Sequence, residues 1–407
     1  MARPYRRATA WARHGRVPDG MHADLLVIGG GPAALAAATA YRDHGGEGSV
    51  VLASADSAAP YARPPLSKDF LRGESEAADA ELTSAMTYTE RGLTLLLRRE
   101  VTALDPAART AGDVTFTTCV LATGARPLRI PVPGADDPAV LTLRSLEDAQ
   151  RLRSAALGAR TAVVVGSGFI GCEAAVSLAR RGLTVTVVAT EELPQLARLG
   201  PEVGERLAAW LEEDGVALRG GASVEEIVGG RRVRLGDGTT LDTDLVLMAT
   251  GVEPAADLAE RAGLAVENGR VVVDAHMRTS VPHVLAAGDV AFAENRAAGR
   301  HLAVEHWGEA EGMGAIAGAT AAGADAVWDT VPGFWSVIGD HTLQYKAWGD
   351  GYDRAHLVDH GDGAFTVWYA DDRGRTVGVA AHGADEDYER GDALIRAGAP
   401  VPTAVRR

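Results

Sequence analysis

The stretch Ala23–Ala34, ADLLVIGGGPAA, decides the fold of the N-terminal half of this 407-residue chain. Its apolar run Ala23–Ile28 predicts a buried strand, and Gly29–Gly31 predicts a tight turn. Pro32 suits the first turn of a helix, and the alanines that continue to Tyr41 favour that helix. Strand, glycine turn and helix in this order predict a dinucleotide-binding unit.

The same order of elements recurs later in the chain. Thr161–Val165 predicts a strand, Gly166–Gly171 (GSGFIG) a glycine turn, and Cys172–Arg181 a helix. Each copy continues with a second predicted strand and then with a strand that is followed by the tripeptide ATG. In the first copy these strands are Ser49–Ala53 and Thr115–Leu121, and the ATG is Ala122–Gly124. In the second copy they are Thr184–Val188 and Leu245–Met248, and the ATG is Ala249–Gly251. Two copies of one plan predict two dinucleotide sites.

The C-terminal part of the chain has shorter predicted elements and more aromatic residues. A strand over Val281–Ala287 leads to Gly288-Asp289, and a helix is predicted over Ala303–Ala317. From about Val327 the sequence predicts a hairpin and a closing helix, formed by Phe365–Tyr369, Thr376–Ala381 and Asp385–Ala397. This segment therefore predicts a small α+β domain.

Composition excludes several classes of function. The formal net charge is −15, which argues against nucleic acid as a partner because phosphate binding needs a basic surface. The two cysteines, Cys119 and Cys172, form no CxxC pair, so neither a disulfide framework nor a metal site is expected. Such usage is typical of a reducing cytoplasm. No apolar run reaches the roughly 20 residues of a membrane span.

Residues 1–20 are basic, with five arginines against the single acid Asp19. They lack the apolar stretch of a signal peptide. We expect residues 1–21 to be a disordered tail, or an extension upstream of a start at Met21. The alternative interpretation is an electrostatic arm for an acidic partner.

The glycines of both copies have a chemical purpose. A dinucleotide carries a charged pyrophosphate, which backbone N–H groups at a helix N-terminus neutralise where glycine lets the backbone approach. The positions that this contact requires are Gly29, Gly31 and Ala34 in the first copy and Gly166, Gly168 and Gly171 in the second.

A carboxylate after the second strand of each copy would accept hydrogen bonds from the adenosine ribose. Asp56 stands there in the first copy, whereas Ala189 occupies the strand tip in the second, followed by Glu191 and Glu192. This turn contains no arginine, so a site for a 2′-phosphate is not evident. The choice between NADH and NADPH stays open, with NADH favoured.

The motif Pro60–Lys68, PYARPPLSK, is the most specific in the chain, and it occurs together with Gly166–Glu173, Gly288-Asp289, Glu305–Trp307 and Phe334–Ser336. In these motifs the sequence resembles the FAD-containing ferredoxin and rubredoxin reductases of oxygenase systems. That family includes putidaredoxin reductase and the reductases of aromatic-ring dioxygenases. The resemblance extends from about residue 21 to the end of the chain.

The resemblance implies that FAD lies along the first copy and NAD(P)H binds on the second. The residues that it places around the cofactors are Arg63, Lys68, Thr123, Arg126, Gly251, Asp289, Glu305, His306 and Trp307. It implies that Phe169 shields the nicotinamide face of the flavin. It also implies that Glu173 lies near the nicotinamide and pairs with Lys68.

Lys68 and Glu173 fit the chemistry of hydride transfer. Hydride arrival makes reduced flavin anionic, so a fixed positive charge near the accepting nitrogen stabilises it. Lys68, one of only two lysines in the chain, would supply that charge, and Glu173 would hold it in place. The plainer interpretations are a solvated lysine and an exposed helix glutamate. Trp307 is expected either to line the docking side of the flavin or to pack in the core.

The sequence thus predicts an α/β fold with two Rossmann-like dinucleotide-binding domains and a small α+β C-terminal domain. The FAD-binding domain would comprise residues 22–128 and 252–326, the NAD(P)-binding domain 129–251, and the C-terminal domain 327–407.

We expect a cytoplasmic enzyme that takes hydride from NAD(P)H onto FAD and passes single electrons to a ferredoxin-type iron–sulfur protein. That protein would feed an oxygenase of the haem-thiolate or Rieske type. One alternative is a redox-sensing or binding flavoprotein with slow turnover. A disulfide, peroxide or persulfide reductase is less favoured, because such enzymes need a redox cysteine beside the flavin and the sequence has Arg63–Lys68 there.

Overall fold

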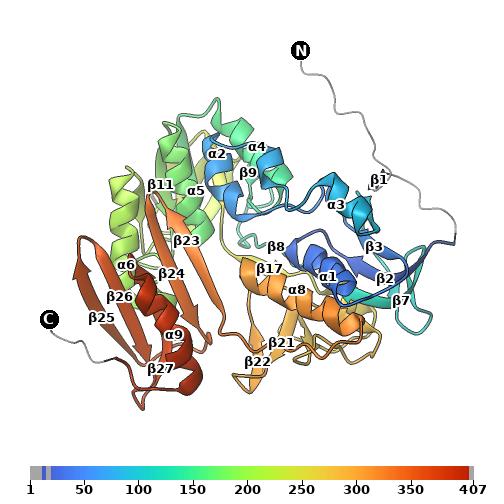
Figure 1. The fold of residues 1–407 in the computed structure, drawn as a ribbon. Helices are drawn as coiled ribbons and strands as arrows, with labels where there is room; N and C mark the ends of the chain where they lie inside the picture. The colour runs from blue at the N-terminus through green and yellow to red at the C-terminus, as the bar shows by residue number, and fades with distance from the viewer. Residues whose placement is uncertain (1–11, 15–19, 403–407) are drawn as a thin grey trace. The chain divides into compact units, whose positions relative to one another are not determined.

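The computed structural model describes residues 12–14 and 20–402. They divide into two compact units, each formed by three segments of the chain (Figure 1). Unit 1 comprises Met1–Ala62, Ala80–Ala125 and Pro254–Thr330, and unit 2 comprises Arg63–Asp79, Arg126–Glu253 and Val331–Arg407, as far as these are described. The motif at Arg63–Lys68 therefore belongs to unit 2. The three domains expected from the sequence remain a prediction beside this division.

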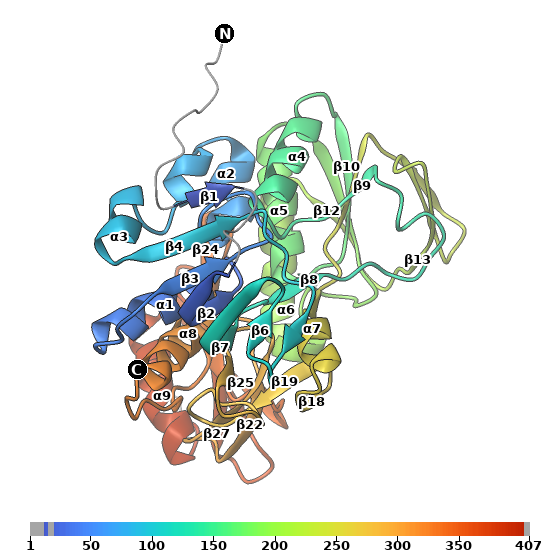
Figure 2. The same cartoon turned by 90° about the vertical axis from the view of Figure 1, so that its right-hand side faces the viewer.

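The eight-stranded sheet of unit 1 contains the first glycine turn. Its order is β1-β4-β3-β2-β7-β6-β5, with β20 also paired to β7, and Figure 2 shows β4, β3, β2 and β7 side by side. The strands are β1 Ala12–His14, β2 His22–Ile28, β3 Val50–Ala53, β4 Leu93–Leu97, β5 Leu104–Asp105, β6 Thr110–Ala111, β7 Val114–Leu121 and β20 Val284–Ala286. The pairs β5–β6 and β6–β7 are antiparallel, and the other strand pairs of this sheet within the described residues are parallel. The central strands β2, from Leu25 to Ile28, and β3 are continuous buried apolar runs because parallel strands are usually buried on both faces.

Helices and a second sheet complete unit 1. Helix α1 (Pro32–Asp43) packs along α8 (Trp307–Ala321), as Figure 1 shows. The four-stranded sheet β18-β19-β21-β22 consists of Val266–Glu267, Arg270–Val273, Ala291–Asn295 and Arg300–Ala303. The two remaining helices are α3 Ala85–Glu90 and α7 Asp257–Arg261.

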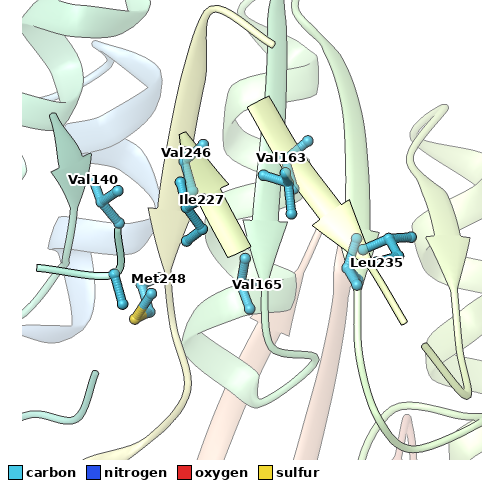
Figure 3. Close-up of a cluster of buried hydrophobic side chains, with 10 residues drawn as sticks. Val140, Val163, Val165, Ile227, Leu235, Val246 and Met248 are labelled. Atoms are coloured by element: carbon cyan, nitrogen blue, oxygen red, sulfur yellow. The ribbon is translucent and has the colours of Figure 1, made fainter. Parts of the chain in front are cut away.

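The parallel sheet of unit 2 contains the second glycine turn, in the order β12-β11-β10-β16-β9. Its strands are β9 Val140–Leu141, β10 Thr161–Val165, β11 Thr184–Val188, β12 Ala217–Arg219 and β16 Leu245–Met248. A three-stranded antiparallel sheet is formed by β13 Val224–Val228, β14 Arg232–Leu235 and β15 Thr240–Asp242. Figure 3 shows how Ile227 and Leu235 of this sheet join Val163, Val246 and Met248 of the parallel sheet in one apolar core.

The helical segments of unit 2 include the PPLSK motif. They are η1 Pro64–Ser67, α2 Asp69–Arg72, α4 Leu146–Ala156, α5 Phe169–Arg180 and α6 Leu196–Glu213, while η2 (Ala77–Ala80) crosses into unit 1. Helix α4 begins with a capping box, in which Ser145 and Asp148 each bond to the other's backbone N–H. Helix α6 is kinked at Gly200, directly before Pro201.

The C-terminal part of unit 2 is an antiparallel sheet with one long helix. The order is β23-β24-β27-β26-β25, and the bounds are β23 Gly333–Ile338, β24 His341–Ala347, β25 Arg354–Gly361, β26 Ala364–Ala370 and β27 Thr376–His382. Helix α9 (Asp385–Ala397) packs on the sheet through Ile395, which lies against Trp368 and Val379. The hairpin and the closing helix predicted from the sequence are both present.

A two-stranded sheet pairs β8 (Ala125–Pro127) with β17 (Val252–Pro254). Each of these strands contains a boundary at which the chain passes from one unit to the other.

Several boundaries differ from the predicted ones. Helix α5 begins at Phe169, not Cys172, and α8 begins at Trp307, not Ala303, since Ala303 is the last residue of β22 and residues 304–306 connect the strand to the helix. Of the predicted tail, Ala12–His14 form a strand paired with β4, whereas residues 1–11 and 15–19 lie outside the described residues. Among the helices of residues 20–402, none has the length and apolarity to cross a membrane.

Candidate functional site: two glycine turns and a buried charge pair

The first glycine turn closely approaches the ATG turn of its own copy. Gly29 has φ +146°, and a Cβ there would lie 2.1 Å from the carbonyl oxygen of Ala122, so only glycine fits. Gly31 is the N-cap of α1 and no side chain caps this end. The helix therefore presents its first backbone N–H groups without a side-chain acceptor, which suits an anionic pyrophosphate. Ala34 is fully buried behind the turn.

The second glycine turn repeats this geometry in unit 2. Gly166 has φ +108°, and a Cβ there would lie 2.4 Å from the carbonyl oxygen of Ala249. Gly168 is the N-cap of α5, again without a side-chain cap. A Cβ on Gly171 would lie 2.2 Å from the carbonyl oxygen of Gly166, which explains the third glycine of this copy.

The backbone hydrogen bonds of the two copies correspond one to one. Ala122 N–H donates to the carbonyl of Ile28, and Ala249 N–H donates to that of Val165, each over 2.8 Å. The following threonines both bond to backbone carbonyls within their own unit: Thr123 to Ala255 over 2.8 Å, and Thr250 to Leu128 over 2.6 Å. Gly251 follows at the exposed end of the second ATG turn. The duplication read from the sequence is therefore a duplication of structure.

The acids expected at the strand tips are held by their own loops. Asp56 accepts hydrogen bonds from the Tyr61 hydroxyl over 2.6 Å and from the Ala58 N–H over 3.1 Å. Glu191 accepts from the Ala197 N–H over 2.9 Å, which ties it to the first turn of α6. A carboxylate has about four acceptor sites, so each acid keeps capacity for a ribose hydroxyl.

Lys68 and Glu173 form a buried ion pair in unit 2, with Lys68 Nζ 2.7 Å from Glu173 Oε2 and side-chain exposures of 12% and 5%. Ser67 Oγ donates to the same oxygen over 2.5 Å. The other oxygen, Oε1, accepts from Ser336 Oγ over 2.7 Å and from the Val337 N–H over 3.3 Å. Burial of a carboxylate is costly unless it is paired and hydrogen-bonded, and here four donors meet that need. The interpretations of a solvated lysine and an exposed glutamate do not describe this pair.

Phe169 is the first residue of α5, one turn before Glu173. Its ring contacts that of Phe334 edge-on, with 4.8 Å between the centroids. Both aromatics therefore lie beside the charge pair within unit 2. Trp335, which follows Phe334, is 51% exposed.

Four further predicted cofactor residues, Asp289, Glu305, His306 and Trp307, lie in unit 1. In unit 1, Gly288-Asp289 lies against Ala33 of α1 and Ala310 of α8, since a Cβ on Gly288 would meet both, and Asp289 is buried. Glu305 is ion-paired with Arg270, His306 is the N-cap of α8, and Trp307, half-buried, is its first residue.

Two predicted arginines of unit 2 have protein partners. Arg63 donates to the carbonyl of Arg144 over 2.9 Å, and Arg126 pairs with Glu253 over 2.7 Å. Both arginines therefore lie in unit 2, although the resemblance places them beside the flavin. Their contacts with a cofactor remain predictions.

Both cysteines are free and buried. Burial raises the pKa of the Cys119 thiol far above its usual range, and it raises the pKa of Cys172 to about 12, with a further contribution from Glu173. Neither thiol is therefore a nucleophile at neutral pH. Within residues 20–402, no group of His, Cys, Asp and Glu has a metal-binding arrangement.

The sequence did not identify Ser67 and Ser336 as partners of Glu173, or Arg270 as the partner of Glu305. Ser67 lies inside the PPLSK motif, and Ser336 lies in the Phe334–Ser336 motif. Membership of those motifs was the only available signal, because a hydrogen bond between residues 163 positions apart leaves no local pattern.

Residues 23–322 match the family described as pyridine nucleotide-disulphide oxidoreductase. The chain is 34% identical to the ferredoxin reductase subunit of the 5,5'-dehydrodivanillate O-demethylase of a Sphingobium species, over 93% of this chain and 95% of that one. It is also 34% identical to the ferredoxin–NAD(+) reductase component of the biphenyl dioxygenase system of Paraburkholderia xenovorans, over 83% and 84% of the two chains.

Two solved structures are similar over most of their length. The reductase in the covalent putidaredoxin reductase–putidaredoxin complex superposes with a TM-score of 0.87 at 29% identity, over 93% of this chain and 94% of that one. A NAD-dependent persulfide reductase from A. fulgidus superposes with a TM-score of 0.84 at 25% identity, over 93% of this chain and 77% of that one.

Proposed function

We propose, since the chain belongs to the pyridine nucleotide-disulphide oxidoreductase family, that it is an FAD-dependent NAD(P)H:ferredoxin reductase. The observation that carries this conclusion is the pair of matched glycine turns together with the buried Lys68–Glu173 pair. The turns at Gly29–Gly31 and Gly166–Gly168 are called the two nucleotide cradles below. Two such sites suit one dinucleotide that stays bound as a cofactor and a second that binds and leaves as a substrate. The relatives that match 93% and 83% of this chain are ferredoxin reductase components of an O-demethylase and of a dioxygenase system.

FAD binds on unit 1 and NAD(P)H on unit 2. The backbone around Gly29 and Gly31 would hold the FAD pyrophosphate, with Gly288, the residue before Asp289, against Ala33 at the start of α1. The backbone around Gly166 and Gly168 would hold the nicotinamide dinucleotide. When bound, FAD supplies an acceptor of two electrons from hydride and a donor of single electrons.

Lys68 would provide a fixed positive charge for this chemistry, and Glu173 would orient it. The ammonium is held by Glu173 over 2.7 Å and by the Pro64 carbonyl over 2.9 Å, so its position is fixed before any cofactor binds. Preorganised charge stabilises developing negative charge more than solvent does, because little reorganisation is needed. Phe169 would cover the face that the nicotinamide approaches.

NADH is the preferred reductant in this proposal. Glu191 and Glu192 follow β11, and no arginine stands between Ala189 and Leu196 to meet a 2′-phosphate. Electrons would pass to a small ferredoxin and then to an oxygenase of the haem-thiolate or Rieske type. The buried, free thiols accord with a cytoplasmic location.

One experiment tests the proposal against its alternatives. The purified protein, reconstituted with FAD, is mixed with NADH or NADPH and a two-iron ferredoxin, and ferredoxin reduction is followed by absorbance. Fast, FAD-dependent reduction is expected. Turnover slower than about one per minute, against typical enzyme values of 1–1,000 per second, would favour the redox-sensing alternative. Faster reduction of a persulfide or disulfide than of ferredoxin would favour the chemistry of the A. fulgidus neighbour.

A further inference from the structure

We propose that Ser336, in strand β23 of the C-terminal sheet, is a positioning residue for hydride transfer. It holds the Glu173 carboxylate, and through that carboxylate the Lys68 ammonium. This inference rests on the proposed function, since the charge pair affects hydride transfer only if NAD(P)H reduces the flavin. It gives the C-terminal sheet a role in the reaction that is distinct from the binding of the two dinucleotides.

Periodicity places Ser336 opposite Glu173. Residues two apart on a strand share one face, so Phe334 and Ser336 point the same way and Trp335 points the opposite way, where it is 51% exposed. Residues four apart on a helix also share one face, so Phe169 and Glu173 of α5 lie one above the other. The contacts Phe334–Phe169 and Ser336–Glu173 join these two faces. One strand therefore supports both groups that the proposed function places at the nicotinamide.

The donors to Glu173 are divided between its two oxygens. Oε2 receives both of its bonds from the PPLSK motif, through Ser67 and Lys68. Oε1 receives both of its bonds from β23, through the Ser336 hydroxyl at 2.7 Å and the longer Val337 N–H contact at 3.3 Å. The hydroxyl is the shorter and stronger of these two bonds. Ser336 is 1% exposed, so water does not replace it readily.

Loss of the Ser336 hydroxyl would free one end of the carboxylate. The group could then rotate about its terminal bond, and the lone pair that faces Lys68 would no longer be fixed. Lys68 would keep its bond to the Pro64 carbonyl but would spend less time paired. The expected consequence is a more reactive and less precisely placed ammonium.

Lysine labelling measures this consequence directly. The chain contains only Lys68 and Lys346, and their side chains are 12% and 17% exposed, so Lys346 is an internal reference. The FAD-loaded protein is treated with a trace of acetic anhydride, and acylation of each lysine is measured by mass spectrometry. Ser336→Ala is expected to raise the Lys68-to-Lys346 ratio at least about threefold, and Ser336→Thr, which keeps the hydroxyl, is expected to restore it.

Thr366→Val is the matched control in the same sheet. Thr366 is fully buried on β26, and its hydroxyl donates to the carboxylate of Asp387 over 2.7 Å, as Ser336 donates to Glu173. The same hydroxyl also bonds to His360 Nε2 over 2.9 Å, so the variant removes an equivalent bond and one more, both away from the charge pair. It is expected to lower the melting temperature much as Ser336→Ala does, with no change in the labelling ratio.

Stopped-flow reduction of the bound flavin by NADH gives the second readout. Ser336→Ala is expected to lower the limiting rate constant about tenfold, with a change in the Kd of NADH below about threefold. Added to Glu173→Gln, Ser336→Ala is expected to cause no further slowing, because both changes remove one coupled interaction.

Three results would overturn the inference: additive slowing in the double variant, equal rate constants in Ser336→Ala and Thr366→Val, or an unchanged Lys68 label in Ser336→Ala. A wild-type flavin that neither NADH nor NADPH reduces would instead refute the proposed function. The labelling ratio would still measure the role of Ser336 in that case.

Discussion

Replacement of Gly166 by alanine is expected to impair the nucleotide cradle of unit 2 and to leave that of unit 1 intact. The added Cβ would lie 2.4 Å from the Ala249 carbonyl oxygen, whereas such contacts in proteins stay beyond about 3.0 Å. The turn must therefore move by about 0.6 Å, or the ATG turn must yield. Gly166 also has φ +108°, which an alanine adopts at a cost of roughly 1–2 kcal/mol.

The movement falls on the backbone that would carry the pyrophosphate of NADH. Misplacement of a binding group by about 1 Å can cost 100-fold, so we expect the KM of NADH to rise about 30- to 100-fold in Gly166→Ala. FAD should stay bound, because its cradle lies in unit 1. Flavin content is measured by absorbance after gel filtration, and KM by steady-state oxidation of NADH.

Gly182→Ala is the matched control for conformational strain. Gly182 has φ +92°, close to that of Gly166, but a Cβ there would meet nothing within 4 Å. The variant carries a similar backbone cost of roughly 1–2 kcal/mol without a clash at the cradle, and it should leave the KM of NADH within about threefold of the wild-type value.

Gly29→Ala tests the nucleotide cradle of unit 1 in the same way. Its Cβ would lie 2.1 Å from the Ala122 carbonyl, so this variant should be purified with little or no flavin. Flavin loss from Gly166→Ala with retention in Gly29→Ala would refute the assignment of the two cradles. A KM in Gly166→Ala equal to that in Gly182→Ala would refute the steric reasoning.

Four further outcomes are expected. Lys68→Met should lower the rate constant of flavin reduction about 100-fold in stopped flow with little change in the Kd of NADH, and an equal loss of binding would remove Lys68 from the chemical step. Cys172, whose pKa burial raises to about 12, and Cys119 should resist iodoacetamide at pH 8 until the protein is unfolded; the same alkylation rate in native and unfolded protein would contradict their burial. NADH should exceed NADPH at least about tenfold in kcat/KM, and Thr190→Arg, at an exposed position, should narrow this ratio. Removal of residues 1–20 should leave the rate of ferredoxin reduction at low salt unchanged, and a large loss would support the electrostatic arm.

The parallel strands were the most predictable part of the fold. Strands β10, β11 and β16 have the predicted bounds, because each is a short apolar run that ends at a small-residue turn. The same holds for the amphipathic helix α9. In these segments local pattern and burial agree, so the sequence alone determines the element.

Helix α8 shows where local pattern was insufficient. The apolar and small residues from Ala303 onward favoured an early start, but Arg300–Ala303 pairs antiparallel with β21 as strand β22. The choice between strand and helix there depends on a partner strand. Propensity yields to such tertiary pairing, which a single sequence does not display.

The charge pair shows a second limit. Lys68 and Glu173 were paired through a family resemblance, but their burial and the bonds from Ser67 and Ser336 were not foreseen. These partners converge from η1, α5 and β23, which are far apart in the chain. A motif thus identified the residues of the site, while the support around them depends on how the segments pack.

The PPLSK segment shows that a segment's place in the chain does not decide which unit holds it. It follows the first glycine-turn copy in the chain, so it would be counted with the FAD-binding half. Helix α5 nevertheless holds the backbone of this segment, since Ser177 donates to the Ser67 carbonyl over 2.7 Å, and its C-cap residue Arg181 donates to the carbonyl of Leu71 in the adjoining α2 over 3.0 Å. These bonds are independent of the Lys68–Glu173 pair, and they fix the segment on the same helix. The position of the Lys68 ammonium is therefore set by unit 2, and it depends on the helix that begins at the second glycine turn.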